Sequence, residues 1–489
     1  MANAAKSNKK PRTAITPTRA EDFPQWYQNV IKAADMAENS AVRGCMVIKP
    51  YGYAIWENMQ KHFDKMIKRE GVQNAYFPLL IPLSYIAKEA EHIDGFAKEC
   101  AVVTHHRLEA GEDGGLVPAG ELAEPMIIRP TSETIIGESF SKWVQSYRDL
   151  PMKINQWANV MRWEMRTRLF LRTSEFLWQE GHNVFETAQQ ASDDARRMLD
   201  VYVEFMENYL AIPALPGVKT PDERFPGAVE TYSMEAIMQD GKALQAGTSH
   251  DLGQTFAKSS NITFQNRDGE DATAYTTSWG ISTRLIGGLI MTHADDDGLI
   301  VPPKVAPYPV VIIPIVHKGA DQSEIVAFCN GIKDQLFELD ITVKVDDSEN
   351  KTPDKLWGAI KHGVPIRVEV GGREMEADQV TYTRRDLGRE SKKTVTVAEF
   401  VQNIQSDLEA MQRDMLDRAR ERTIEMIHDV SDLAELKEFF VKENTGLVRI
   451  DLSKIDTPEF EAICSEFSLT PRCIPFEDNG LKVFVGKAY

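Results

Sequence analysis

Two apolar runs on either side of a basic loop, within residues 159–187, constrain the fold of this chain more than any other feature. The first run covers residues 160–164, the loop at 165–168 carries Arg166 and Arg168, and the second run returns through residues 169–176. Runs of this composition around a short polar loop are typical of a β-hairpin. The stretch therefore predicts two antiparallel strands joined by a positively charged loop.

Arg162 and Glu164 suggest a chemistry for this hairpin. Residues two apart on a strand face the same side. An arginine there can hold a phosphate while the neighbouring carboxylate accepts an amine. The alternative is an ordinary ion pair on a solvated sheet face.

Length and composition limit the class of protein. A chain of 489 residues implies roughly three domains. No apolar run reaches membrane-spanning length and the N-terminus is polar and lysine-rich, so we expect a cytoplasmic protein with no membrane partner. Five scattered cysteines without a C-x-x-C spacing indicate neither a disulfide framework nor a structural zinc site. The net charge of −18 excludes a uniformly basic surface but leaves room for local basic patches that could bind RNA.

The N-terminal part alternates helices and strands. Residues 1–20 are predicted to be a mobile tail. Apolar spacing predicts helices at 22–38 and 53–69, with a strand at 43–48 between them. The strand at 75–82 contains two prolines, so it should lie on a sheet edge or at a subunit boundary. Residues 109–121 are expected to form a Gly-rich acidic loop.

Residues 126–134 read as a buried strand that ends in hydroxyls and a carboxylate, followed by a helix. Thr131 or Ser132 could cap that helix, with Glu133 at its positive end. The alternative is that the strand end offers Thr131 and Glu133 to a ligand with an ammonium group.

Later segments predict a mainly antiparallel sheet. A helix at 190–210 is followed by strands at 232–238, 244–247 and 262–264. His250 ends a polar cluster and could be structural or ligand-binding. Gly280 would let a flat ligand approach the backbone, and Arg284, at a strand-to-helix junction, could reach a phosphate.

From residue 302 the composition changes to short β-rich runs separated by helices, which predicts a compact α/β domain. A dense basic group in it suggests contact with a polyanion, although solvated surface is the alternative: Arg367, Arg373, Arg384, Arg385, Arg389, Lys392 and Lys393. A charged helix at 401–426 and a small α/β segment follow.

Taken together, these motifs resemble the class II aminoacyl-tRNA synthetases. The helix-to-strand element with Gly71 and Pro78, the hairpin with Arg162-x-Glu164, and the Gly280-to-Arg284 junction are similar to motifs 1, 2 and 3 of that class. The 129–133 loop, the 178–182 turn and residues 245–250 resemble motifs of prolyl-tRNA synthetases of the archaeal and eukaryotic type. Enzymes of this type lack the editing insertion of their bacterial-type relatives. The likeness covers residues 20–489.

The resemblance implies roles for individual residues. Arg162, Glu164 and Arg284 would be the catalytic set. ATP would be bound by Arg162, Glu164, Arg172, Thr173, Gln245, Thr248 and Arg284. Proline would be bound by Thr131, Glu133, Arg162, Trp178, His182, Phe225, His250 and Ser282.

The resemblance also implies an architecture and partners. It assigns a mixed α/β fold: an α+β catalytic domain with an antiparallel sheet flanked by helices at 21–302, an α/β anticodon-binding domain at 303–402, and a helix with a small α/β domain at 403–489. The implied activity is ATP-dependent attachment of L-proline to tRNA(Pro) through prolyl-adenylate, with Mg²⁺ accompanying ATP, in a homodimer.

Two departures from the family pattern affect metals. Thr283 stands where the wider class has an acidic residue before the motif 3 arginine, so we do not expect that position to place a metal ion. Only Cys464 and Cys473 remain where many relatives hold zinc through four cysteines. We therefore expect no structural zinc. The alternatives to proline attachment are a class II synthetase for another small amino acid and a catalytically silent RNA-binding paralogue.

Overall fold

The computed structural model describes residues 13–87, 99–316, 322–477 and 480–489. Their contacts group into two units. The larger comprises Glu38–Val47, Met59–Gly288 and Leu416–Tyr489, and the smaller contains the N-terminal segment through Ala37, Ile48–Asn58 and Leu289–Met415. Most of the predicted mobile tail lies outside the described residues, but Ile15 is buried and its N–H donates to the Asp296 carbonyl at 2.8 Å.

The larger unit is built on an eight-stranded sheet with the order β23-β9-β10-β11-β14-β8-β7-β3. Its strands are β3 Gln73–Asn74, β7 Met152–Met161, β8 Glu175–Phe185, β9 Leu215–Val218, β10 Glu230–Ile237, β11 Ala243–Gly253, β14 Tyr275–Ser282 and β23 Ile474–Pro475. Neighbouring strands are antiparallel except β3 and β7. The predicted antiparallel core is therefore confirmed.

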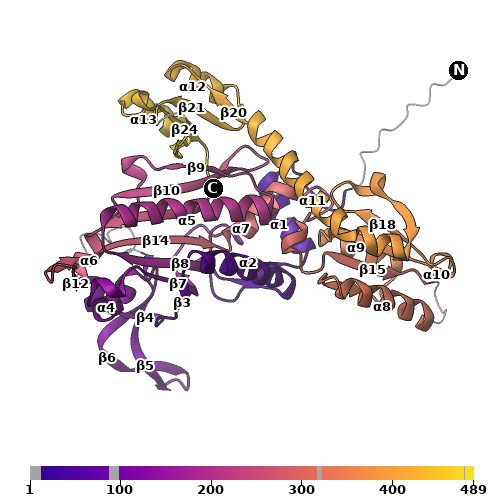
Figure 1. The fold of residues 1–489 in the computed structure, drawn as a ribbon, viewed down its shortest axis with the longest axis horizontal. Coiled ribbons are helices and arrows are strands. Elements are labelled where there is room, and N and C mark those ends of the chain that lie inside the picture. Colours follow the sequence, from indigo (N-terminus) through magenta and orange to yellow (C-terminus); the bar gives the residue numbers. More distant parts are fainter. Residues whose placement is uncertain (1–12, 88–98, 317–321, 478–479) are drawn as a thin grey trace. The chain divides into compact units, whose positions relative to one another are not determined.

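Helix α5 (Ala188–Leu210) lies along this sheet (Figure 1) and packs on β10, β11 and β14. Thr187 caps it by accepting a hydrogen bond from the Gln190 N–H. Met198, Tyr202, Phe205 and Met206 are fully buried on its sheet-facing stripe. The other face of the sheet is thereby left to the cavity described below.

The hairpin predicted at residues 159–187 exists with different limits. Strand β7 ends at Met161 and β8 begins only at Glu175. Residues 169–171 are apolar because they are buried in a turn, with Phe170 at a φ of 62°, rather than because they form a strand. Arg162 and Glu164 therefore lie just beyond the strand, so the same-face argument for them was wrong.

The rest of the larger unit flanks the sheet. Strands β4 (Leu80–Pro82), β5 (Val102–Ala110) and β6 (Leu116–Ile128) form a sheet in the order β4-β6-β5. The edge position predicted for the proline-containing strand is confirmed, but only residues 80–82 of the predicted 75–82 form a strand. The loop predicted at 109–121 was wrong, since β5 and β6 pair across most of it. Other elements are α4 Glu133–Trp143, α6 Thr255–Ser259, β12 Thr263–Gln265, β13 Asp271–Thr273, β20 Ile427–Asp429, α12 Leu433–Val441, β21 Leu447–Asp451, α13 Pro458–Phe467, β22 Thr470–Pro471 and β24 Lys482–Gly486.

The smaller unit contains a five-stranded sheet with the order β16-β15-β17-β18-β19. Its elements are α1 Phe23–Ala33, β15 Val310–Pro314, α8 Ser323–Phe337, β16 Val343–Val345, α9 Thr352–Lys361, β17 Ile366–Val370, α10 Gly372–Glu376, β18 Gln379–Arg384 and β19 Lys393–Thr396. Helices α2 (Pro50–Arg69), α7 (Arg284–His293) and α11 (Val397–Glu425) include residues of both units. The predicted α/β domain is confirmed, with β18 as an unpredicted strand.

The basic group of this unit is largely neutralised by its own acids. Arg385 pairs with Asp295 at 2.6 Å and Arg384 with Asp414 at 2.7 Å. The Glu369 carboxylate pairs with Arg367 Nη2 at 3.1 Å and with Lys392 Nζ at 2.8 Å. Most of this group is thus engaged within the domain, which weakens the polyanion interpretation.

Candidate active site

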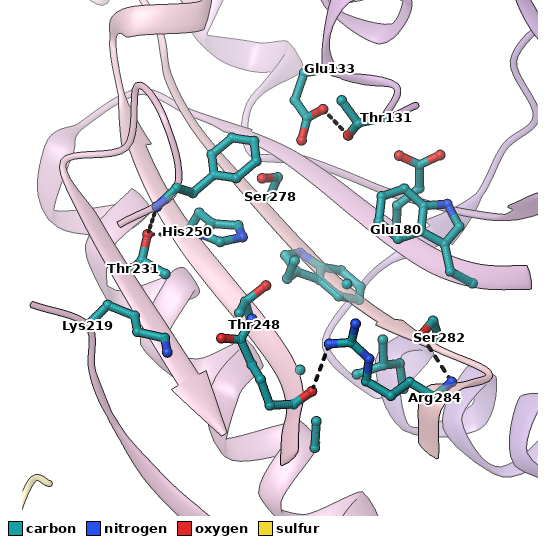
Figure 2. Close-up of a pocket in the computed structure, with 18 of the residues that line it drawn as sticks. Thr131, Glu133, Glu180, Lys219, Thr231, Thr248, His250, Ser278, Ser282 and Arg284 are labelled. Carbon is teal, nitrogen blue, oxygen red and sulfur yellow. Dashed lines mark hydrogen bonds between the residues drawn. The ribbon is translucent and has the colours of Figure 1, made fainter. Parts of the chain in front are cut away.

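A cavity of about 250 Å³ opens on the sheet face opposite α5 (Figure 2). Strand alternation explains which side chains line it. On β8 the residues facing the cavity are Trp178, Glu180 and His182, and on β14 they are Ser278, Gly280 and Ser282. The predicted 178–182 turn was wrong, because these residues form the middle of a paired strand.

Intervening residues of these strands and of β11 contact α5, although Trp279 also lines the cavity. The Tyr202 hydroxyl donates to Gln179 Oε1 at 2.8 Å, and Ser249 Oγ donates to the Ala195 carbonyl at 2.7 Å. The Thr277 hydroxyl donates to Asp194 Oδ2 at 2.9 Å. These bonds fix the register of the strands against the helix, so the cavity-facing set cannot rotate away.

A bulge on β11 brings an additional residue to the cavity. Met234 pairs with Gly247 and Glu235 with Gln245, so Ala246 has no partner on β10. The extra residue shifts the alternation by one position. As a result Gln245 lines the cavity together with Thr248 and His250.

Gly181 sets the position of Trp279 on the neighbouring strand. The two residues pair across β8 and β14, and a Cβ on Gly181 would lie 1.9 Å from Trp279 Cε2. Any side chain at residue 181 would displace the indole, which also lines the cavity.

Two arginines from distant parts of the chain line the cavity. Arg162 Nε donates to the Pro130 carbonyl at 3.0 Å, and its guanidinium lies 5.6 Å from the ring centres of Phe176 and Trp178. Arg284 Nε donates to the Leu171 carbonyl at 3.1 Å and its Nη1 to the Gln245 carbonyl at 3.3 Å. Each guanidinium is thus oriented by backbone oxygens.

The two charges act on each other. Burial, followed by the positive charges of Arg172 and Arg162, lowers the pKa of Arg284 to about 10. Burial also lowers the pKa of Arg162, against the opposing effect of Glu133 and Glu180. Both groups stay charged at neutral pH, so this part of the cavity favours an anionic ligand.

Glu133 and Thr131 lie across the cavity from Arg284, and the Thr131 hydroxyl donates to Glu133 (Figure 2). The predicted helix cap is not formed by a hydroxyl. Ser132 occupies the N-cap position of α4 without a capping bond, and its Oγ donates to Glu180 Oε1 at 2.6 Å instead. The strand end therefore presents its carboxylate to the cavity, as the ligand-binding alternative predicted.

Glu180 and His182 form a buried pair. His182 Nε2 donates to Glu180 Oε2 at 3.0 Å, and Gln156 Nε2 donates to Glu180 Oε1 at 2.8 Å. Burial alone would lower the pKa of His182, but the Glu180 hydrogen bond and the charge of Glu133 raise it above its usual value. Burial alone would raise the pKa of Glu180, but the hydrogen bond and charge of His182, together with the hydrogen bonds from Ser132 and Gln156, lower it below its usual value.

His250 stays neutral beside this pair. Burial lowers the pKa of His250 to about 3, and the charge of His182 contributes. Its ring lies 4.6 Å from that of Phe225, so the two form an uncharged aromatic wall. The cavity thus combines an anion-binding part, a carboxylate and an apolar wall.

Comparison with known proteins identifies the family. Residues 119–293 match the tRNA synthetase class II core domain (G, H, P, S and T), and residues 309–407 match an anticodon binding domain. A proline–tRNA ligase of Bdellovibrio bacteriovorus is 53% identical over 484 residues, 97% of each chain. The chain belongs to the proline–tRNA ligase family. A second such ligase, of Rhodopirellula baltica, is 52% identical over 96% of this chain and 94% of its own, and a third, of Protochlamydia amoebophila, is 51% identical over 97% and 95%.

Most of the site residues predicted from the family resemblance line this one cavity. The cavity is lined by Thr131, Glu133, Arg162, Trp178, His182, Phe225, Gln245, Thr248, His250, Ser282 and Arg284. It is not lined by Glu164, Arg172 or Thr173. Arg172 Nε lies 3.8 Å from Glu164 Oε1, and the Thr173 hydroxyl donates to the Glu175 carbonyl at 2.7 Å.

Glu180, Lys219 and Ser278 are among the cavity residues that sequence reasoning missed. Glu180 and Ser278 follow from strand alternation once Trp178, His182 and Gly280 are assigned to one face. Within the described part of the chain, Ser278 Oγ is buried without a hydrogen-bond partner, which suits a polar ligand atom. Lys219 gives no local signal, because its partner is sixteen residues away on another strand.

Replacing Glu180 by glutamine should lower the pKa of His182 below its usual value. The folded pKa is raised, so protonation of His182 contributes stability that is present below its unfolded pKa and lost as pH rises through the folded one. Without Glu180, the burial effect prevails. An NMR titration of the imidazole checks this, and an unchanged pKa would contradict the pairing.

Proposed function

We propose that this protein attaches L-proline to tRNA(Pro) in two steps with ATP. A proline carboxylate oxygen attacks the α-phosphorus, the bond to the bridging oxygen breaks, and pyrophosphate leaves with that bond's electron pair. A ribose hydroxyl at the end of the tRNA then attacks the prolyl carbonyl and AMP leaves. The observation that carries the proposal is that Arg162, Arg284 and Glu133 line one cavity.

Proline fits the uncharged end of the cavity. Its cationic ring nitrogen would meet Glu133 and Thr131, and its pyrrolidine would pack against Phe225, His250 and Trp178. His182 and Ser282 would complete the pocket. We assign its carboxylate to Arg162, which lies between Glu133 and the nucleotide residues.

The nucleotide would occupy the arginine-lined end. Arg162 and Arg284 would neutralise phosphate charge, with Gln245 and Thr248 beside them. Arg172, Glu164 and Thr173 would have to reach the nucleotide from outside the cavity. Mg²⁺ would enter with ATP, bound to its phosphates. Positioning and charge neutralisation suffice for this reaction, so no nucleophilic side chain is required.

We further propose three domains, at 21–302, 303–402 and 403–489, with the second reading the anticodon. We place the protein in the cytoplasm: its cysteines are free and no helix in the described ranges is long and apolar enough to cross a membrane. Zinc is not needed, since Cys473 is buried with its thiol directed at the Leu215 carbonyl.

Amino-acid-dependent exchange of pyrophosphate into ATP tests the function. Proline should support exchange, and the other amino acids should support it far less. Exchange that depends on another amino acid would show that the site takes that amino acid instead of proline. No exchange with any amino acid would indicate a catalytically silent paralogue. Charging of tRNA(Pro) with labelled proline then tests the second step.

We also propose a homodimer that uses strands β5 and β6. Among the described residues β5 is an edge strand of its sheet, and this hairpin exposes Val102, Leu108, Leu116 and Val117 by 43 to 72%. Such an edge favours pairing with a second copy of the chain. The double change Leu108→Asp and Leu116→Asp should halve the mass measured by light scattering, whereas Ile424→Asp, equally exposed on α11, should not.

A further inference from the structure

Three charged side chains form a buried cluster beside the cavity: Lys219, Glu235 and Arg472. Lys219 Nζ lies 3.1 Å from Glu235 Oε1, and Arg472 donates to Glu235 Oε2 from Nη2 at 2.9 Å and from Nε at 3.2 Å. The exposed fractions of the three side chains are 2, 0 and 8%. Arg472 comes from the segment next to β23 and is more than two hundred residues from Glu235 in the sequence.

The cluster carries one more positive than negative charge. A surplus charge is costly to bury unless a counter-charge compensates it. Arg472 holds one carboxylate oxygen in a two-nitrogen grip, which leaves Lys219 as the cation next to the cavity that it lines. An anion bound in the cavity would supply the missing charge.

The cluster belongs to the arginine-lined end of the cavity. Glu235 pairs with Gln245 across β10 and β11, and the Gln245 carbonyl accepts from Arg284 Nη1. The charge of Glu235 also acts on Arg284, whose pKa it raises against the effect of burial. In Figure 2 the ammonium of Lys219 is directed into the cavity from the side of Thr248, while Glu133 lies on the far side.

We propose that Lys219 binds a phosphate group of the nucleotide, on the pyrophosphate side, and that Arg472 positions Lys219 through Glu235. This proposal rests on the proposed function. Lys219 would contact the ligand directly, whereas Arg472 would be a positioning residue that fixes the Glu235 carboxylate. A residue of the C-terminal segment would then help set the affinity for ATP.

The first test is Lys219→Met, which leaves Glu235 and Arg472 as a balanced pair and should fold. We expect the KM for ATP in pyrophosphate exchange to rise about 10- to 100-fold, with the KM for proline unchanged within about twofold. The matched control is Lys242→Met, an ion-paired lysine outside the cavity. A rise in the KM for proline instead would overturn the phosphate assignment, as would no change in either constant.

The second test separates positioning from stability. Arg472→Met should raise the KM for ATP in the same direction, and Arg472→Lys, which keeps the charge but not the two-nitrogen grip, should recover part of the loss. A lowered melting temperature with an unchanged KM for ATP in both variants would overturn the positioning role. Absence of exchange in the unmodified protein would refute the proposed function, while direct binding of ATP to the unmodified and Lys219→Met proteins would still test Lys219.

Discussion

Replacing Arg162 by alanine should lower proline-dependent pyrophosphate exchange by roughly a thousandfold. The guanidinium is held by the Pro130 carbonyl, and its charge interacts with those of Glu133 and Arg284. It can therefore stabilise the charge that develops as the carboxylate attacks the α-phosphorus. The effect should appear mainly in kcat, because the charge is greatest in the transition state.

Arg166→Ala is the matched control for this prediction. Arg166 belongs to the same loop but is exposed and does not line the cavity, so its loss should leave exchange nearly unchanged. Binding of tRNA, measured by filter retention, should persist in both variants. Exchange that survives in Arg162→Ala would contradict the site.

Replacing Glu133 by glutamine should raise the KM for proline by about 100-fold or more. The carboxylate faces the cavity beside Thr131, and it is the acid assigned to the cationic ring nitrogen. A cation left without its carboxylate in a desolvated pocket costs roughly 3 kcal/mol or more. The KM for ATP should change little, since Arg162 and Arg284 remain.

Glu138→Gln controls for changes to helix α4 itself. Glu138 lies on the same helix, pairs with Lys142 and is outside the cavity. Its replacement should leave both Michaelis constants unchanged. If Glu133→Gln weakened ATP and proline equally, the carboxylate would serve the fold of the site rather than amino acid recognition.

The sequence predicts the site better than it predicts the limits of the elements. Family resemblance predicted Trp178 and His182 as binding residues, but not that they share one face of a strand, because a turn was predicted at 178–182. The motif arginines Arg162 and Arg284 were also predicted, although they are far apart in the chain. Family resemblance was needed to place them at one ligand.

Misses arose where tertiary contacts decide the conformation. The run at 169–171 has strand composition, yet it is buried in a turn closed by the bridge between Arg168 and Arg172. The polar, glycine-containing residues 109–121 pair mostly as exposed strands. The sequence did not predict these strands because exposed positions carry no apolar pattern. The bulge at Ala246 and the pairing of Arg472 with Glu235 have no local signature at all.

The pairing of β23 with β9 has a consequence for biosynthesis. Strand β9 is completed near residue 218, but its outer neighbour is translated only at residues 474–475. Domains tend to fold from the N-terminus during translation. The outer edge of β9 therefore stays unpaired while some two hundred and fifty further residues emerge from the ribosome. Ribosomal stalling in that interval would leave a nascent chain open to mispairing at β9 and in need of chaperone protection.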